Sequence, residues 1–142
     1  MIVWIEKRLA LAIHDRQLAE HGGGAGLRDQ SLLESALARP QQLHAYGDPP
    51  PDLADLAASL ACGLARNHPF VDGNKRTAHV CYRVFIALNG GQMDADQDEM
   101  YVSMLGLADG TLSEAEFADW LRPRVRLKDA GRVQEPSAAY AG

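Results

Sequence analysis

Cysteine is scarce in this sequence, with only Cys62 and Cys81 among 142 residues. The two are not spaced as a CxxC pair, and each falls within an apolar pattern. A disulfide framework or a thiolate metal site is therefore not indicated. We interpret both cysteines as small core residues of a cytoplasmic protein in a reducing compartment.

Long apolar runs and an excess of positive charge are also lacking. No segment approaches about 18 consecutive apolar residues, so we expect no membrane-spanning helix. The first residues, MIVWIEKRLALAIHDR, mix charges into the apolar stretch, unlike the core of a signal peptide. Lysine and arginine number 14 against 19 acidic residues, a net charge of −5. This balance argues against nucleic-acid binding through a basic face, although a locally basic pocket is compatible with it.

Strand-like alternation of useful length is missing too, and helical periodicity dominates. We expect an all-α fold, a compact bundle of about six helices. One domain would cover residues 1–127, with a flexible C-terminal tail at 128–142. Helices are expected at about 6–21, from about 31, at 53–67, at 74–88, from about 96 and from about 113. Brief strand pairing is expected, if anywhere, at residues 1–4 or 43–51.

Capping signals predict where four of these helices begin. They are Ser31 with Glu34, Asp52, Asp96 with Glu99, and Ser113 with Glu116. Pro40 is expected to kink or end its helix, because proline has no backbone N–H and clashes with the preceding turn. The three prolines at 49–51 predict an extended surface segment over about 43–52.

The stretch HPFVDGNKRTA, at 68–78, connects the two most apolar helices. The neutral imidazole of His68 can accept a proton from a hydroxyl near pH 7. Asp72 is a hard oxygen ligand of the kind that Mg²⁺ prefers, and it is equally suited to cap a helix. The stretch thus combines a candidate base with a candidate metal ligand.

The second helix is expected to begin near Gly73 or Asn74, where free N–H groups and the helix dipole favour an anion. Asn74 is suited either to cap the helix or to contact a phosphate. Lys75 and Arg76 place two cations in the first turn, which is unfavourable unless an anion compensates. Transfer of a phosphate-containing group from a nucleotide requires such a combination of base, metal ligand, anion site and cations.

The segment HPFVDGNKR closely resembles the motif of the Fic/Doc family, His-Pro-Phe-x-Asp/Glu-Gly-Asn-x-Arg. The chain up to about residue 125, including AIHDRQLAEHGG and GLRDQSLLESALARP, looks like the death-on-curing (Doc) branch, the toxins of Phd/Doc toxin–antitoxin pairs. The resemblance implies a helical Fic/Doc-like fold and an enzyme of the transferase class.

The resemblance also implies roles for residues of the motif. His68 would be the catalytic base that deprotonates a target hydroxyl, Asp72 would bind Mg²⁺, and Phe70 would pack the loop into the core. Nucleotide phosphates would be bound by Gly73, Asn74, Lys75 and Arg76, with Arg76 also counted as catalytic. The segment at 43–52 falls where such folds carry a flap that aligns the target chain, and Arg66 is a weaker candidate to face the site.

Two positions differ from the pattern of AMP-transferring relatives. Those proteins have glycine where this chain has Lys75, and a second arginine where it has His79. Lysine at this position looks like the Doc branch, whose members use ATP to phosphorylate elongation factor Tu and so arrest translation. We therefore favour phosphoryl transfer and keep AMP transfer as the alternative. A Phd-like antitoxin is the expected partner.

Two further alternatives belong to other classes of protein. One is a non-catalytic binding module with a degenerate Fic fold, against which the intact His68, Asp72 and Arg76 argue. The other is a metal hydrolase, which would need His79 and the His14-Asp15 pair to join the motif residues around zinc. We interpret His14-Asp15 as a structural or surface pair instead.

Overall fold

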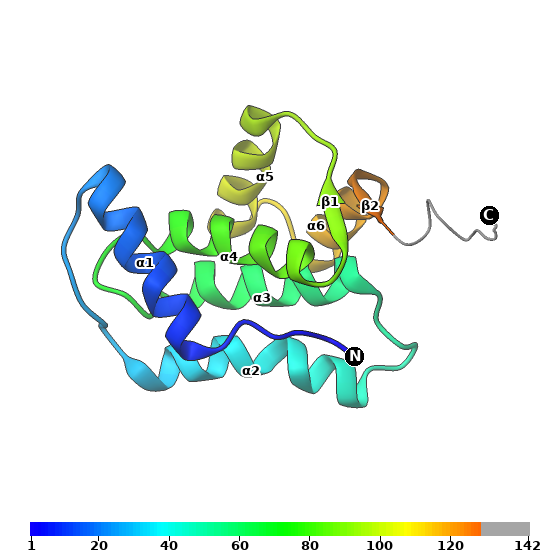
Figure 1. Ribbon diagram of the computed structural model, residues 1–142, viewed down its shortest axis with the longest axis horizontal. Coiled ribbons are helices and arrows are strands. Elements are labelled where there is room, and N and C mark those ends of the chain that lie inside the picture. Colours follow the sequence, from blue (N-terminus) through cyan, green and yellow to red (C-terminus); the bar gives the residue numbers. More distant parts are fainter. Residues whose placement is uncertain (129–142) are drawn as a thin grey trace.

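A computed structural model describes residues 1–128 and confirms the all-α class with six α-helices (Figure 1). The helices are α1 (Lys7–His21), α2 (Gln30–Tyr46), α3 (Leu53–Asn67), α4 (Asn74–Leu88), α5 (Gln97–Asp109) and α6 (Glu114–Leu121). A 3₁₀ turn, η1 (Arg122–Arg124), follows α6. The expected tail lies outside the described residues except for Lys128.

Helix α3 is the centre of the bundle. It lies between α2 and α4 and also contacts α5 and α6, while α1 packs on α4 (Figure 1). Every residue from Leu56 to Ala65 is buried, as expected for a helix surrounded on all sides. A buried α3 fixes its own C-terminal end and the start of α4, and these two ends carry the HPFVDGNKR motif.

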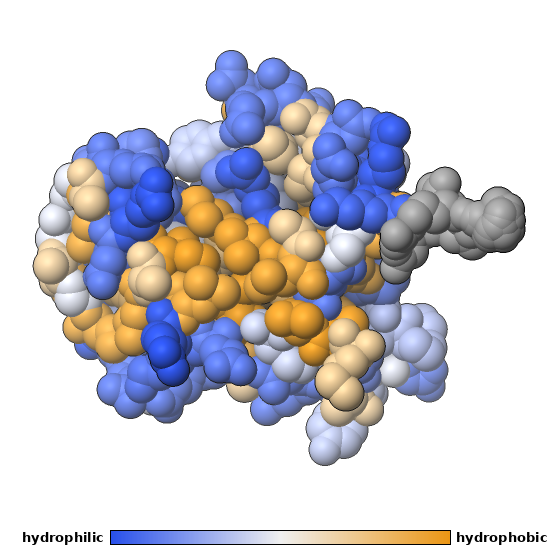
Figure 2. Space-filling view, viewed as in Figure 1, coloured by the Kyte–Doolittle hydropathy of each residue, from blue (hydrophilic) through white to orange (hydrophobic). Residues whose placement is uncertain are grey.

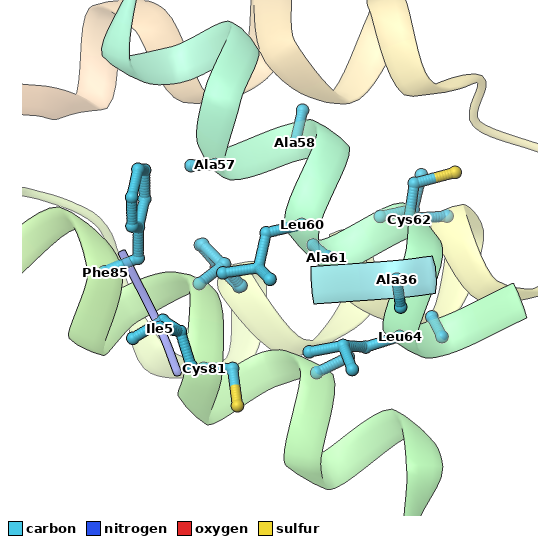
Figure 3. Packing of buried hydrophobic residues seen from close by; sticks show 14 of the residues in the cluster. Ile5, Ala36, Ala57, Ala58, Leu60, Ala61, Cys62, Leu64, Cys81 and Phe85 are labelled. Carbon is cyan, nitrogen blue, oxygen red and sulfur yellow. The ribbon is translucent and has the colours of Figure 1, made fainter. Parts of the chain in front are cut away.

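The core is built largely from small side chains of α3, which allow the helices to approach closely. Figure 3 shows Ala57, Leu60 and Ala61 of α3 near Ala36 of α2 and Phe85 of α4. At Gly63, an added Cβ would lie 3.1 Å from the Ala36 Cα. Both cysteines are buried and unpaired, which confirms that they are core residues.

A short antiparallel pair of strands, which we did not predict, closes the bundle at the C-terminal end of α4. Strand β1 (Gly91–Met93) pairs with β2 (Val125–Leu127), so the expected pairing at 1–4 or 43–51 was wrong. Beyond β2, the Lys128 amide donates to the Gly90 carbonyl at 2.8 Å. The Asn89 side chain exchanges two hydrogen bonds, each 2.8 Å, with the backbone of Val3.

The predicted capping box of Ser31 and Glu34 is wrong. Helix α2 begins two residues earlier, with the Asp29 carboxylate accepting the Leu32 amide at 3.1 Å. The Ser31 hydroxyl donates to that carboxylate, and Glu34 instead accepts from Lys7. An acceptor with a full charge competes better for the free amides of a first turn than a hydroxyl does.

Pro40 neither ends nor visibly interrupts α2, contrary to expectation. Proline removes one backbone hydrogen bond, but the buried face of the helix continues through Leu33, Ala36, Leu37 and Pro40. Leu43, one turn further on, also packs against the core. The predicted caps at Asp52, Asp96 and Ser113 are confirmed, each accepting an amide of the first turn.

Figure 2 shows a broad apolar area on the face that carries α1, α2 and the N-terminal segment. A groove there is lined by exposed Val3, Leu9 and Leu88. No helix within residues 1–128 has both the length and the apolar character needed to cross a bilayer. The groove shares no residue with the polar pocket formed by the motif.

Candidate active site

The motif forms one pocket of 340 Å³ where the loop from α3 enters α4. Its walls are His68, Val71, Asp72, Gly73, Asn74, Lys75, Arg76 and Tyr101. All six residues predicted for catalysis or phosphate binding therefore line a single cavity. Five of them are consecutive and the sixth lies four residues upstream. Their proximity in the pocket therefore follows from their proximity in the sequence.

His68 lies at the C-terminal end of α3 in the left-handed conformation, with φ 51° and ψ 56°. This conformation is uncommon for a residue other than glycine. The Arg28 side chain supports it, donating to the carbonyl oxygens of His68 at 2.7 Å and Asn67 at 2.9 Å. The turn leaves the His68 side chain exposed in the pocket, where it can reach a substrate hydroxyl.

The carboxylate of Asp72 is held by backbone amides on two sides. It accepts the Gly73 amide at 2.9 Å and the Gly24 amide at 3.3 Å. Gly23 lies so close that an added Cβ would be 2.9 Å from Asp72 Oδ2. Asp72 is therefore fixed in orientation and remains exposed to solvent.

Asn74 fixes the loop rather than facing a ligand with its side chain. Its amide oxygen accepts the Phe70 amide at 2.9 Å, and its amide nitrogen donates to the Phe70 carbonyl at 3.0 Å. Phe70 is 1% exposed, which confirms its predicted place in the core. Only the backbone of Asn74 is left for the predicted phosphate contact.

The start of α4 carries two exposed cations and no side-chain cap. Gly73 precedes the helix with φ 76°, and no side chain of the described residues accepts the amides of the first turn. Within the described chain, neither Lys75 nor Arg76 makes a salt bridge. Free amides, the helix dipole and two unpaired cations together make this end of the pocket suited to an anion.

His79 does not act as a substitute for a second arginine of the pocket. It is 9% exposed and packs edge-on against Tyr82 and Tyr101. Burial, and to a lesser degree the charge of Arg83, lowers the pKa of His79 to about 4. The ring is therefore neutral at pH 7 and contributes no positive charge.

Two other expectations from the sequence are wrong. Arg66 faces away from the pocket and donates to the carbonyls of Leu107 and Leu112. The proline segment leads into the first residue of α3, whereas the pocket lies beyond its last. Since α3 has 15 residues, about 20 Å separates the segment from the pocket.

The segment that lies along the loop of the motif, residues 68–73, is 22–29, between α1 and α2. Its backbone exchanges hydrogen bonds with the loop: the amides of Arg28 and Asp29 donate to the Pro69 carbonyl, and the Val71 amide donates to Gly26. Leu27 and Phe70 form an isolated antiparallel bridge. This segment, rather than 43–52, occupies the place of the expected flap.

The chemistry of the pocket fits Mg²⁺ with phosphate. From the part of the chain that the structure describes, the two oxygens of Asp72 accept only two backbone amides, so lone pairs are left for a hard cation. Among residues 1–128, no three His, Cys, Asp or Glu side chains gather into a metal-binding group. A three-ligand zinc site of the kind that a hydrolase needs thus finds no support in this region.

Sequence reasoning missed three residues that complete the site. Tyr101 comes from α5, and its ring lies beneath the guanidinium of Arg76, 5.9 Å from the Arg76 Cζ. His14 of α1 bonds to the Asp72 carbonyl, and Arg28 bonds to the end of α3. Arg28 and His14 lie in GLRDQSLLESALARP and AIHDRQLAEHGG, which the resemblance singled out as segments. His14 was otherwise interpreted, with Asp15, as a structural or surface pair, and the structure buries His14 and leaves Asp15 exposed.

Comparison with known families agrees with this geometry. The sequence profile of the Fic/DOC family matches residues 4–86, which include α1 to α3, the HPFVDGNKR motif and most of α4. More than half of the chain is covered by the match. This chain belongs to the Fic/DOC family.

Two relatives within the family are informative. The chain is 51% identical over 78 residues to a protein named Toxin Doc from Mycolicibacterium smegmatis; the match covers 54% of this chain and 59% of that protein. It is 35% identical over 112 residues to Protein kinase doc from Escherichia phage P1, covering 79% of this chain and 87% of that protein. The chain thus spans less than two thirds of the first relative and most of the second.

Proposed function

We propose that this protein is a Doc-like toxin that acts as a protein kinase, transferring the γ-phosphate of ATP to a hydroxyl group of a target protein. One observation supports the proposal above all. A single pocket collects a candidate base, a fixed carboxylate, an uncapped helix N-terminus and two unpaired cations. The names of the two relatives, a toxin and a protein kinase, point in the same direction.

In the proposed reaction, the target hydroxyl attacks the γ-phosphorus while His68 takes the hydroxyl proton. A bond forms between the hydroxyl oxygen and that phosphorus, the bond to the β–γ bridging oxygen breaks, and ADP leaves. Lys75, Arg76 and the first amides of α4 would bind the phosphate oxygens and stabilise their charge in the transition state. Asp72 would hold Mg²⁺, which when bound neutralises part of the phosphate charge.

Phosphoryl transfer is favoured over AMP transfer by two residues. Lys75 lines the pocket where AMP-transferring members of the family have glycine. His79 replaces their second arginine with a ring that is buried and neutral at pH 7. The pocket therefore has one cation at the first position and lacks one at the second, a distribution unlike that of an AMP-transferring site.

The biological context of the proposal rests on the resemblance and the relatives. The expected target is elongation factor Tu, and its phosphorylation would arrest translation. A kinase of this kind would have to be restrained in its own cell, so we also propose a Phd-like antitoxin as partner.

The experiment that tests the function is intact-protein mass spectrometry of elongation factor Tu after incubation with this protein, ATP and Mg²⁺. We expect a gain of one phosphoryl group. His68→Ala should lower the rate by about 10² to 10⁴, whereas His44→Ala, an exposed histidine on α2, should not change it. A chelator should abolish the reaction.

Each other outcome changes a specific part of the proposal. A gain of one AMP would show that Lys75 and His79 do not select the chemistry. Full activity of His68→Ala would refute the base assignment, and activity in the presence of chelator would refute the role of Mg²⁺. In another outcome, elongation factor Tu stays unmodified while γ-labelled ATP labels another protein in a lysate. This result would identify that other protein as the target.

A further inference from the structure

Among residues 1–128, Tyr101 is the only one that lines the pocket from outside the segment 68–76. It lies near the start of α5. The ring is partly buried, and the Arg76 guanidinium lies over it at 5.9 Å from the ring centroid. This separation is at the outer limit of a cation–π contact.

The ring of Tyr101 is itself held in place by α4. The imidazole of His79, one turn beyond Arg76, meets it at 5.4 Å between centroids and an interplanar angle of 84°. His79 in turn packs against Tyr82, which is fully buried. Tyr101 is thus supported from the core and presents its ring to Arg76.

Arg76 has no other restraint of comparable kind. It is exposed, and within residues 1–128 it forms no salt bridge and no side-chain hydrogen bond. A free arginine loses considerable rotamer entropy when it binds an anion, so a contact that restricts it beforehand lowers that cost.

We propose that Tyr101 is a positioning residue that holds the Arg76 guanidinium in the pocket, ready for the phosphate chain of a nucleotide. The proposal rests on the proposed function, because it assumes that Arg76 binds phosphate. The proposal also gives α5, which lies outside the motif, a part in substrate binding.

A tyrosine beside a nucleotide site has an obvious competing role, since an aromatic ring can stack on a nucleobase. The two roles differ in which ligand they serve. A ring that positions Arg76 affects every ligand with a phosphate chain, whereas a ring that stacks on a base affects only ligands that carry the base. Inorganic tripolyphosphate, which has the chain but no nucleoside, separates them.

The experiment measures the affinity of the full chain for Mg·ATP and for Mg·tripolyphosphate by titration calorimetry. The variants are Tyr101→Leu, Arg76→Gln and the double variant. Tyr101→Phe tests rescue by a conservative change, because it keeps the ring. Val102→Ala, an exposed neighbour on α5 that is 65% exposed, is the matched control.

We expect Tyr101→Leu to weaken both ligands by the same factor, about three- to fivefold, and Tyr101→Phe to restore most of this loss. In the Arg76→Gln background, Tyr101→Leu should cause no additional loss, because the two residues act as a pair. A general loss of structure would instead persist in that background, and circular dichroism would detect it.

Four results would overturn the inference. Weakening of ATP alone would assign the ring to the nucleobase. Equal losses with and without Arg76 would mean that Tyr101 acts independently of it. Unchanged binding by Tyr101→Leu, with Arg76→Gln weakened, would refute this inference and leave the proposed function intact. Tripolyphosphate binding unaffected by Arg76→Gln would refute the phosphate role in the proposed function, and the inference with it.

Discussion

The imidazole of His14 lies flat against the phenyl ring of Phe70, with centroids 3.8 Å apart and an interplanar angle of 7°. His14 Nε2 also donates to the Asp72 carbonyl at 2.8 Å. Both rings are almost completely buried. One side chain of α1 therefore fixes the loop of the motif at two points, at Phe70, two residues from the candidate base His68, and at the candidate metal ligand Asp72.

His14→Ala should lower the free energy of unfolding by about 2–4 kcal/mol, since it creates a cavity beside Phe70 and leaves the Asp72 carbonyl without its partner. Urea denaturation measures this loss. His14→Phe, which keeps a ring but not the hydrogen bond, should be intermediate, and the exposed Asp15→Ala should stay within about 0.5 kcal/mol of the wild type. A fully stable His14→Ala would show that α1 does not anchor the loop.

Asn74→Ala should destabilise the protein by about 1–3 kcal/mol, because the amide and carbonyl of Phe70 both lose their partner in a partly buried loop. Asn74→Asp keeps an acceptor for the amide and loses the donor to the carbonyl, so we expect a smaller effect. Thermal unfolding of the three proteins provides the comparison. If Asn74→Ala binds tripolyphosphate less well without any loss of stability, the side chain has a ligand role instead.

Gly23→Ala should reduce activity about 10- to 100-fold by displacing the Asp72 carboxylate, since small misplacements of catalytic groups are costly. Gly23 has φ 123° and its added Cβ would lie 2.9 Å from Asp72 Oδ2. Gly26→Ala is the matched control, because Gly26 has φ 104° but no atom within 4 Å of an added Cβ. Both changes strain the backbone, so equal activity of the two variants would contradict the steric explanation.

Arg28→Ala should lower kcat about tenfold with little change in KM for ATP. The substitution removes the hydrogen bonds to the carbonyls of His68 and Asn67, and these bonds stabilise the left-handed conformation of His68. Arg28→Lys, which keeps the charge but not the forked geometry, should recover only part of the rate. Steady-state rates of target phosphorylation give kcat and KM for both variants. Arg16→Ala, an exposed arginine of α1 paired with Glu20, should behave as wild type. A change in KM alone would assign Arg28 to substrate binding.

His79 should make the fold less stable in mild acid. Its folded-state pKa of about 4 lies below the usual value of 6.5, so the unfolded chain takes up a proton first as the pH falls. Stability contributed by the neutral ring is complete above about pH 6.5, decreases between 6.5 and 4, and changes no further once the folded state is also protonated. His79→Leu should show a smaller decrease in melting temperature over this range, and parallel pH profiles would contradict the prediction.

Much of the fold could be predicted because its signals are local. Helices 53–67 and 74–88 were predicted with the bounds that the structure has, since caps and apolar stripes mark them in the sequence. Asp29 was overlooked because Ser31 and Glu34 have the same spacing as a true capping box. Strands of three residues show no alternation long enough to recognise, and their partners lie more than 30 residues apart.

The candidate site likewise contains residues that local sequence signals predict and residues that only tertiary packing brings in. His68 to Arg76 form a nearly continuous stretch, so the motif itself indicated the pocket. Tyr101, His14 and Arg28 reach it only through packing of α5, α1 and the segment 22–29, which no local pattern encodes. The burial of His79 could not be predicted for the same reason, because it depends on packing against Tyr82 and Tyr101.

The ties of Val3 to Asn89 and of Lys128 to Gly90 have a practical consequence for handling the protein. Both lie at the C-terminal end of α4, whereas the pocket is at its N-terminal end, about 20 Å away along 15 residues. A linker to a sensor surface can be attached N-terminal to Val3 or C-terminal to Lys128. The pocket would then be directed away from the sensor surface, toward the solution. Immobilised in this way, the protein keeps its pocket accessible to ligands in solution.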